Sequence, residues 1–580
     1  MEKRVLLAVF LSFLVLFIYQ SLVRPSPERN QAIIEPLSSA DDQAAQQSIG
    51  RAATTPVTPP APIQEAARLS TAEALVADET ARDVIVETDF VRAVFSTEGA
   101  VLTSWRLKGY RDGQKEPLEL IPQELEGVRP FSLLLETRPE LTATLQKALF
   151  RPSRSELLVT NRIASLEFEY RDTSGLRAFK AFRFDPDQPF VVHLEVEVET
   201  LEGPEDVILQ WGPGLPGGDD GESSTFRRQG PQGIFSQAGE VSRLDTSDLL
   251  EQADYDGRFD FVGIDDHYFI SAAISNDELL EVHYEPVNTT ATSTRNLVAY
   301  DIQLPTTASA ATFFVGPKDF DILGNVNSEF VRAVHFGIFS WLVVPLHRSL
   351  KWVYGFVGNY GWSIILITIM INALMFPLRH KSVVSMRKMQ EIQPEMKAIQ
   401  DRYKNLKATD PGKQKMNQEL MSLYRERGVN PASGCLPMLL TMPVLFAFYS
   451  LLSVAIEIRD APFILWIQDL SQHDPLYVTP ILMGVTMVAQ QRMTPSTADP
   501  MQQKIMMVMP VVFTFMFLWA PSGLVLYWLM SNIWGVGQQI ITNRVIGPPP
   551  VHNIRPPAER LIKTRGAGKK GKGSRSRNSS

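Results

Sequence analysis

The sequence predicts a polytopic α-helical membrane protein that carries a large all-β domain outside the cytoplasm. Short apolar runs cluster near the carboxyl end of the 580-residue chain, and one more lies at its start. Between them, a long stretch alternates apolar and polar residues as half-buried strands do. The formal net charge of −8 is divided unevenly, with −22 for residues 24–377 and +6 for residues 378–432. Acidic and basic parts on a chain with apolar runs indicate opposite sides of a membrane.

Residues 1–23 are expected to form an uncleaved membrane anchor, the first of six spans. Lys3 and Arg4 precede its apolar run and should hold the amino terminus in the cytoplasm. A cleaved signal peptide has the same charge and length, but no small-x-small cleavage pattern follows this run. Residues 24–82 are rich in Ala, Gln, Pro, Ser and Thr, which indicates a disordered external linker.

Residues 83–320 are expected to form a β-sandwich with a core of its own. The segments VIVETDFVRAVFS, ASLEFEYRD, RAFKAFRFD and VVHLEVEVE alternate in period two, with Gly, Pro, Asn and Asp between them. The sequence has no GxSxG, HExxH or phosphate-loop motif, and its many carboxylates indicate a solvated acidic face. Cys435 is the single cysteine, and no His or Cys cluster has metal-ligand spacing. We therefore expect no enzyme, no metal and no cofactor.

Residues 328–360 combine an apolar core with basic residues, and Pro345 interrupts that core. The apolar run is too short to span a bilayer. Trp341, Trp352 and Tyr354 suit a membrane interface. An amphipathic helix that lies on the outer membrane surface is therefore expected here.

The second span, residues 361–378, carries the polar side chains of Thr368 and Asn372. These lie four residues apart and share a helical face, which should contact protein or water rather than lipid. Residues 433–545 should supply four further spans of the core, at about 436–458, 477–490, 505–519 and 524–541. Polar side chains in these spans either join helices or surround an aqueous concavity open to the cytoplasm.

Residues 379–432 should form a cationic helical hairpin in the cytoplasm. One interpretation is a self-packed, solvated loop. The other is a methionine-rich surface that captures apolar peptide segments or anionic lipid. That surface would include Arg387, Lys388, Met389, Met396 and Tyr403. Residues 546–580 form a basic cytoplasmic tail, with anionic lipid and the ribosome as candidate partners.

Three long segments resemble one known family. GVNPASGCLPMLLTMPVLFAFY begins at Gly428, APFILWIQDLSQHDPLYVTPILMGVTM at Ala461, and DPMQQKIMMVMPVVFTFMFLWAPSGLVLYW at Asp499. Together with the order of anchor, β-domain, interfacial helix and five-span core, they resemble the YidC/Oxa/Alb family of bacterial membrane protein insertases, in its long Gram-negative form. The resemblance implies a periplasmic β-supersandwich, an inner-membrane location with both termini cytoplasmic, and a hydrophilic groove open to cytoplasm and lipid. It also implies insertion and folding of nascent integral membrane proteins, alone or with the Sec translocon.

Groove residues are expected from the resemblance and from the polar side chains of the spans. They are Thr368, Asn372, Gln490, Gln491, Tyr527 and Trp528. In this family the second span usually carries a positively charged groove residue, and Asn372 stands at the matching position here. Trp528 follows Tyr527 where enteric members have two tyrosines. An amide forms hydrogen bonds but has no net charge, so position 372 is not expected to attract acidic substrate tails.

A secondary transporter and a membrane assembly scaffold are the two alternative functions. Transporters usually show paired inverted repeats and acidic residues at mid-membrane, whereas Glu457 and Asp460 lie at the end of a predicted span. A scaffold would explain the β-domain but not the polar side chains inside the spans.

Overall fold

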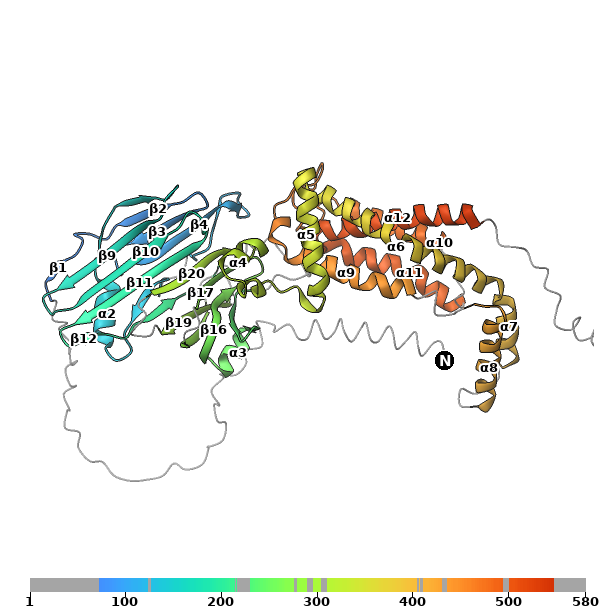
Figure 1. Cartoon of the computed structure of the whole chain (residues 1–580), viewed down its shortest axis with the longest axis horizontal. Coiled ribbons are helices and arrows are strands. Elements are labelled where there is room, and N and C mark those ends of the chain that lie inside the picture. The colour runs from blue at the N-terminus through green and yellow to red at the C-terminus, as the bar shows by residue number, and fades with distance from the viewer. Residues whose placement is uncertain are drawn as a thin grey trace, which may run out of the picture. The chain divides into compact units, whose positions relative to one another are not determined.

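The computed structural model describes residues 72–123, 127–213, 215, 230–275, 279–288, 296–303, 310–403, 406, 410–429, 436–493 and 500–546. The predicted anchor, most of the predicted linker and all of the predicted basic tail after residue 546 lie outside these ranges. The described residues form a β-domain and a helical region (Figure 1).

The β-domain contains two sheets. The larger sheet has 15 strands in the order β1-β9-β10-β11-β20-β17-β16-β18-β19-β13-β6, with β7, β12, β14 and β15 paired beside this path. The smaller sheet has five strands in the order β5-β4-β3-β2-β8. The strands are β1 (Ala74–Val76), β2 (Asp83–Glu87), β3 (Val91–Ser96), β4 (Val101–Arg111), β5 (Pro117–Glu119), β6 (Ser132–Leu134), β7 (Arg151–Pro152), β8 (Glu156–Leu158), β9 (Ala164–Asp172), β10 (Arg177–Phe184), β11 (Val191–Thr200), β12 (Gly203–Pro204), β13 (Ile208–Trp211), β14 (Gln232–Gln237), β15 (Glu240–Leu244), β16 (Asp254–Asp265), β17 (Phe269–Ile274), β18 (Leu279–Asn288), β19 (Asn296–Gln303) and β20 (Ala310–Pro317). Three short helices accompany them, α2 (Pro139–Lys147), α3 (Thr246–Glu251) and α4 (Phe320–Val326).

The four segments with alternating sequence are strands, as predicted. They correspond to β2 with β3, β9, β10 and β11, and their burial alternates along each strand. β10 is antiparallel to both β9 and β11, and in its pairing with β9 Phe168 lies opposite Lys180 and Tyr170 opposite Ala178. Because the side-chain period of a strand is two, this register places one face of each strand in the core.

The two sheets pack face to face over an aromatic core. Phe95 of the smaller sheet lies 4.6 Å from Phe182 of the larger sheet, measured between ring centroids. The buried Trp105 donates its indole N–H across the sandwich to the carbonyl oxygen of Val315, at 3.0 Å. A buried indole needs such a partner, and this one joins the sheets directly. The predicted β-sandwich is therefore present.

The helical region follows the β-domain in the sequence. Its helices are α5 (Ser340–Val357), α6 (Tyr360–Glu391), α7 (Gln393–Arg402), α8 (Pro411–Glu426), α9 (Leu436–Val454), α10 (Val478–Met493), α11 (Pro500–Met516) and α12 (Ser522–Ile546). Short 3₁₀ turns accompany them, η2 (Phe330–Ala333), η3 (Gly337–Phe339), η5 (Ile456–Ile458) and η6 (Phe517–Trp519). A helix therefore lies at each of the five positions where a core span was predicted.

Two helix boundaries differ from the predictions. α5 begins at Ser340, well after residue 328, because η2 and η3 occupy the preceding residues. Pro345 lies inside α5 and does not end it. α6 runs through Pro377 and beyond the predicted end of the second span, so the span and the first part of the hairpin are one helix. The next helix starts around Pro394, a residue that favours the first turn of a helix over its interior.

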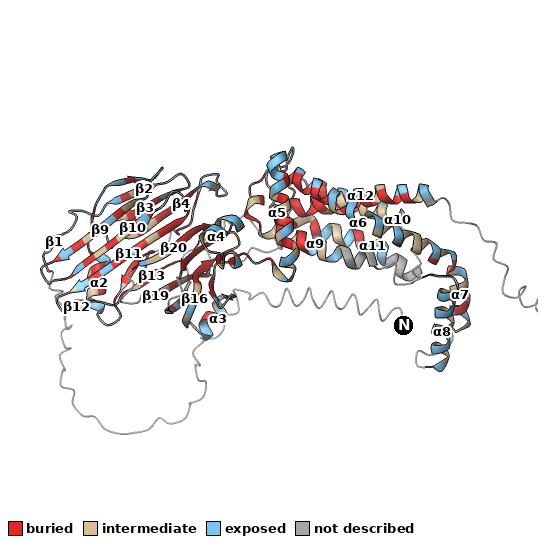
Figure 2. Cartoon of the chain, in the orientation of Figure 1, coloured by how far each residue is buried: buried red, intermediate tan, exposed pale blue. Residues whose placement is uncertain are grey.

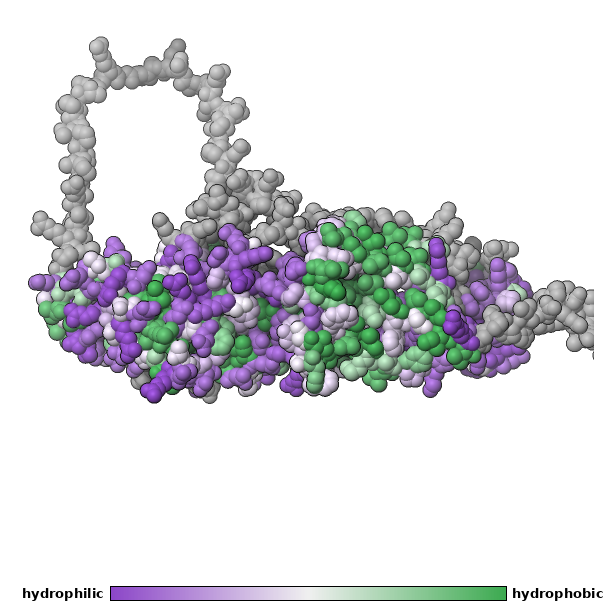
Figure 3. Space-filling model, turned by 90° about the horizontal axis from the view of Figure 1, so that it is seen from above, coloured by the Kyte–Doolittle hydropathy of each residue, from purple (hydrophilic) through white to green (hydrophobic). Residues whose placement is uncertain are grey.

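One described helix, α6, is long and apolar enough to cross a bilayer by length and composition. Shorter apolar helices run over Thr441–Val454 and Met506–Trp519. Hydrophobic residues cover much of the visible surface of the helical region, whereas hydrophilic residues dominate that of the β-domain (Figure 3). This contrast is typical of a helical region that contacts lipid.

Candidate functional site

The helical region is packed tightly at one end and open at the other. Buried residues gather near α5 and become sparse toward α7 and α8 (Figure 2). Many of the buried apolar side chains come from the amino-terminal parts of α6, α10 and α12 and from the last turns of α9. We call this the sealed end. It is the end at which α5 packs. Buried polar side chains, among them Asn532, Gln538 and Thr542, continue farther along α12.

An open cavity of about 420 Å³ lies between α6, α9, α10 and α12, away from the sealed end. Its lining residues are Arg379, Ser382, Val383, Met386, Thr441, Met442, Leu445, Gln490, Tyr527, Trp528, Ser531, Asn532, Gly535, Gln538 and Gln539. Among these described residues, Arg379 is the single cation and none is a carboxylate. Most of the others are amides, hydroxyls or apolar side chains, so the cavity offers many hydrogen bonds and one positive charge.

Arg379 is held in the cavity by a chain of hydrogen bonds along α6. Its Nη1 donates to Oδ1 of Asn372 at 2.7 Å, and Nδ2 of Asn372 donates to the carbonyl oxygen of Thr368 at 2.7 Å. The Thr368 hydroxyl in turn donates to the carbonyl oxygen of Ile364 at 2.6 Å. Helical side chains point toward the amino end of their helix, which lets Arg379 reach back two turns to Asn372. The amide therefore positions the guanidinium.

The structure divides the six predicted groove residues into two groups. Gln490, Tyr527 and Trp528 line the cavity. Thr368 and Asn372 are 0% and 3% exposed and lie outside its lining. Gln491 is half-buried and is also outside the lining. Tyr527 stacks on Phe448 with ring centroids 4.1 Å apart, which fixes its place in the wall.

Gly535 makes room for one of the lining amides. A Cβ at this position of α12 would lie 2.3 Å from Nε2 of Gln490, closer than real side chains approach. The glycine therefore lets Gln490 of α10 extend over the backbone of α12. α10 and α12 can therefore pack closely at this point while the side chain of Gln490 stays between them.

Sequence reasoning missed Arg379, Gln538 and Gln539 as lining residues. The predicted second span ends at residue 378, which assigns Arg379 to the cytoplasmic hairpin and not to the groove. The available signal was its spacing. Arg379 follows Asn372 by seven residues, or about two helical turns, and shares its face once α6 continues through Pro377.

The hairpin formed by α7 and α8 packs on itself. Met389, Ile392, Ile399, Leu423 and Val429 form a small buried cluster, with Met396 and Tyr403 against it. The Tyr403 hydroxyl donates to Glu419 at 2.8 Å, and Arg387 donates to Oδ1 of Asn543 at 2.5 Å. Lys388 is exposed. This geometry favours the self-packed interpretation, because three of the five residues assigned to a capture surface face the interior of the hairpin.

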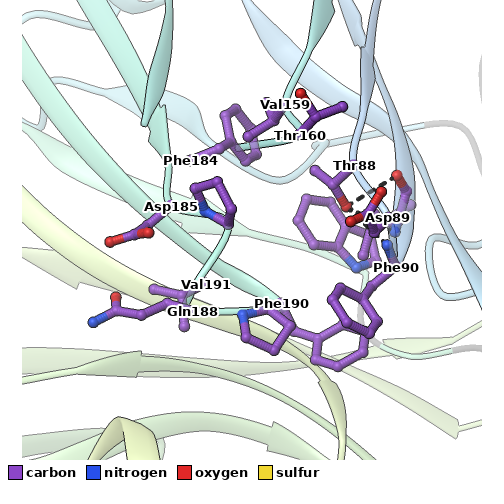
Figure 4. Close-up of a pocket in the computed structure, with 14 residues that line it drawn as sticks. Thr88, Asp89, Phe90, Val159, Thr160, Phe184, Asp185, Gln188, Phe190 and Val191 are labelled. Atoms are coloured by element: carbon purple, nitrogen blue, oxygen red, sulfur yellow. Dashed lines mark hydrogen bonds between the residues drawn. The ribbon is translucent and has the colours of Figure 1, made fainter. Parts of the chain in front are cut away.

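A second pocket lies in the β-domain, where Phe90, Phe190 and Asp185 surround a narrow space (Figure 4). Its volume of about 30 Å³ is close to that needed for one water molecule. Thr88 closes one side, because its hydroxyl accepts hydrogen bonds from the backbone N–H groups of Phe90 and Val91. This pocket is too small for a ligand larger than water.

The exposed apolar surface of the helical region and its polar cavity are typical of one class of protein, the membrane proteins that contain a hydrophilic cavity. Residues 83–349 match the family model described as the YidC periplasmic domain, and residues 352–548 match the model described as the 60Kd inner membrane protein. Relatives named membrane protein insertase YidC include one from Syntrophus aciditrophicus (strain SB), 35% identical over 94% of this chain and 100% of the relative. Another, from Geotalea uraniireducens (strain Rf4), is 36% identical over 94% of this chain and 99% of the relative.

The chain belongs to the YidC family of membrane protein insertases, which are not enzymes. Among solved structures, an active YidC insertase with its first transmembrane domain resolved is 18% identical, covers 82% of this chain and 95% of its own, and has a TM-score of 0.33. A galactose mutarotase related enzyme from Lactobacillus acidophilus covers 40% of this chain and 97% of its own, at 13% identity and a TM-score of 0.26. TM-scores this low do not support any inference that these structures share a functional site with this chain.

Proposed function

We propose that this protein inserts and helps fold integral inner-membrane proteins by sheltering the polar tail of a client in its cavity. The observation that supports this is the polar, open cavity beside tightly packed helix ends. A peptide that leaves water without new hydrogen-bond partners incurs several kcal/mol for each unsatisfied group, on the order of 2–7 kcal/mol. The amides and hydroxyls of the cavity replace those partners. Only the sealed end then remains to be crossed.

The proposed topology has six spans. Helices α6 and α9 to α12 provide five, and the apolar run in residues 1–23 provides the sixth. The cavity faces the cytoplasm, the sealed end and the β-domain face the periplasm, and both termini are cytoplasmic. This orientation agrees with the basic residues at the α7 end of α6 and with the acidic composition of residues 24–377. The Sec translocon is the proposed partner for larger clients, with the ribosome and anionic lipid as partners of the basic tail.

Arg379 supplies the positive charge that position 372 lacks. Its guanidinium lies in a cavity without a carboxylate among the described lining residues, so its field is not neutralised there. A client tail with acidic residues is attracted to this charge, and the attraction is stronger in a partly desolvated cavity than in bulk water. Asn372 contributes indirectly, because its Oδ1 accepts the hydrogen bond that holds Arg379 in place. The lining also gives no support to an ion-coupled transporter, which usually has acidic residues at mid-membrane.

The test is an insertion assay in proteoliposomes with two single-span clients that differ only in their tails. One tail carries two aspartates and the other carries two asparagines. Arg379→Gln should slow insertion of the acidic client about tenfold, equivalent to about 1.4 kcal/mol, and leave the neutral client nearly unchanged. Asn372→Leu should act in the same direction, because it removes the acceptor for the guanidinium.

Three controls accompany this assay. Arg379→Lys retains the charge, and Asn372→Gln retains a carbonyl acceptor, so both should insert the acidic client faster than the variants that remove these groups. Arg492→Gln changes an exposed arginine of α10 outside the cavity lining and should have no effect. If Arg379→Gln inserts both clients at the wild-type rate, the proposed role of this cavity charge is wrong.

A further inference from the structure

α5 carries two basic side chains on the face that packs against the rest of the helical region. His347 and Lys351 lie four residues apart, so they share one face of the helix. Nε2 of His347 donates to Oε1 of Glu457 at 2.8 Å, and Nζ of Lys351 lies 3.4 Å from the same oxygen. Glu457 belongs to η5, directly after α9. Two positions of α5 therefore hold one carboxylate at the sealed end.

Lys351 also binds the last helix of the β-domain. Its Nζ donates to Oδ2 of Asp321 at 2.5 Å and lies 3.7 Å from Oδ2 of Asp319. Asp319 is the N-cap of α4, where its carboxylate accepts the backbone N–H groups of Asp321 and Ile322. One ammonium thus joins carboxylates from α4 and from η5, which are more than a hundred residues apart in the sequence.

We propose that Lys351 is the central ion of a latch that joins the β-domain to the insertase core. The latch consists of Asp319, Asp321, His347, Lys351 and Glu457. It holds α4, α5 and η5 together, so that α5 stays over the sealed end while the β-domain and the core keep a fixed connection. Its opening would release α4 and η5 together.

His347 contributes a buried hydrogen bond to Glu457. Its ring is only 3% exposed and lies 5.7 Å from Phe320 and 6.4 Å from Phe336, measured between ring centroids. Nδ1 is buried, and no described residue accepts or donates a hydrogen bond there. A proton on Nδ1 would leave a buried donor unsatisfied, so the proton belongs on Nε2, which donates to Glu457. The ammonium of Lys351 lies beside the same carboxylate, 3.4 Å from Oε1 of Glu457.

The charge of Lys351 is stable across the neutral pH range. Burial acts to lower its pKa, but Asp321, Asp319 and Glu457 together raise that pKa above its usual value. A group with a raised pKa stabilises the folded state below its ordinary pKa and loses that contribution only as the pH rises through the folded value. Removing the ammonium would leave three carboxylates close together without their shared cation. The latch should therefore depend on Lys351 more than an isolated surface ion pair would.

Hydrogen–deuterium exchange of the full chain in lipid nanodiscs tests the latch. Lys351→Met should increase the exchange rates of α4 amides and of the η5 amides by about fivefold. Both sets of amides should change, because Lys351 joins the carboxylates of α4 to the carboxylate of η5. Lys351→Arg keeps the cation and should show a smaller increase. Lys147→Met removes an exposed lysine of α2 and should change neither set.

Protection of β10 serves as the folding control, since that strand is paired on both sides, with β9 and β11, in the larger sheet. Glu457→Gln provides a second variant, because it removes one charge while keeping a hydrogen-bond acceptor for His347. It should also increase exchange in both α4 and η5. Faster exchange in α4 alone, or unchanged exchange in both elements with β10 protected, would overturn the proposed latch.

Discussion

Lys180 is fully buried in the β-domain, where a lysine is rarely found. Its Nζ donates to the carbonyl oxygens of Gly99, Ala100 and Phe131 at 2.7, 3.1 and 2.8 Å, and it lies 5.6 Å from the ring centroid of Phe150. Lys180 belongs to β10 of the larger sheet, whereas Gly99 and Ala100 form the turn between β3 and β4 of the smaller one. The ammonium therefore joins the two sheets through backbone acceptors. Burial lowers the pKa of Lys180 to about 7.

This lowered pKa predicts that the stability of the β-domain rises with pH. Between pH 7 and the ordinary lysine pKa of 10.5, the unfolded chain binds more protons than the folded chain, so the unfolding free energy increases with pH. The slope approaches about 1.4 kcal/mol per pH unit within that window. Exchange rates of β10 amides, corrected for their intrinsic pH dependence, measure it. Lys180→Met should be less stable at pH 9 and should lack this slope, and an equal slope in both proteins would contradict the assignment.

At the residue scale, the sequence indicated polar positions but not which of them reach the cavity. Thr368 and Asn372 share a face as predicted, yet hydrogen bonds within α6 satisfy both of them, and neither lines the cavity. Arg379 lines it because a long side chain can reach back along a helix. Reach of this kind depends on where the helix ends, and α6 continues to Glu391, beyond residue 378, where the second span was predicted to end.

At the scale of elements, the contact between α10 and α12 depends on Gly535. Gly535→Ala should displace Gln490 from the cavity, because the new Cβ would overlap its amide nitrogen. Gln490 is flexible, so the side chain should move while the backbone stays in place. Insertion should then fall severalfold with little change in stability. Gly537→Ala on the same helix is the matched control, since no atom lies within 4 Å of its new Cβ.

Insertion and thermal unfolding of both variants in proteoliposomes separate these effects. Alanine favours a helix by up to about 1 kcal/mol over glycine, so any gain in stability should appear in both proteins. A Gly535→Ala protein that inserts clients as fast as the Gly537→Ala protein would show that the Gln490 amide is dispensable.

The sequence predicted the positions of the strands more accurately than the residues at which the helices begin and end. Period-two alternation identified β9, β10 and β11, because a sheet with one buried face needs that pattern. The pairing of these strands with distant ones such as β20 was not visible in the sequence, since long-range register depends on the whole sandwich. For the hairpin, the sequence indicated methionine-rich apolar positions but not whether they pack within the hairpin or contact a partner. Met389 and Met396 pack within the hairpin itself.

At the scale of the whole molecule, the lengths of the helices set the thickness of membrane that they match. α10 has 16 residues and α11 has 17, so they extend about 24 and 26 Å at 1.5 Å per residue. The hydrocarbon core of a bilayer is about 30 Å thick. A bilayer that contacts these helices should therefore thin locally, at a modest free-energy cost for each ångström of mismatch. In the proposed mechanism, thinning and the cavity would act together, because each would shorten the apolar distance that a client's polar tail must cross.

Insertion should consequently be fastest in thin bilayers and slow as the acyl chains lengthen. Thicker membranes increase the cost of local thinning and lengthen the apolar barrier beside the cavity. Proteoliposomes made from phosphatidylcholines of increasing acyl-chain length, with equal amounts of protein, measure this dependence after subtraction of spontaneous insertion into protein-free vesicles. The acidic and neutral clients should slow to the same degree, because thickness acts on the barrier and not on the charge of Arg379. Rates that stay constant or rise with thickness would mean that the short helices do not lower the barrier, and the cavity alone would then have to account for insertion.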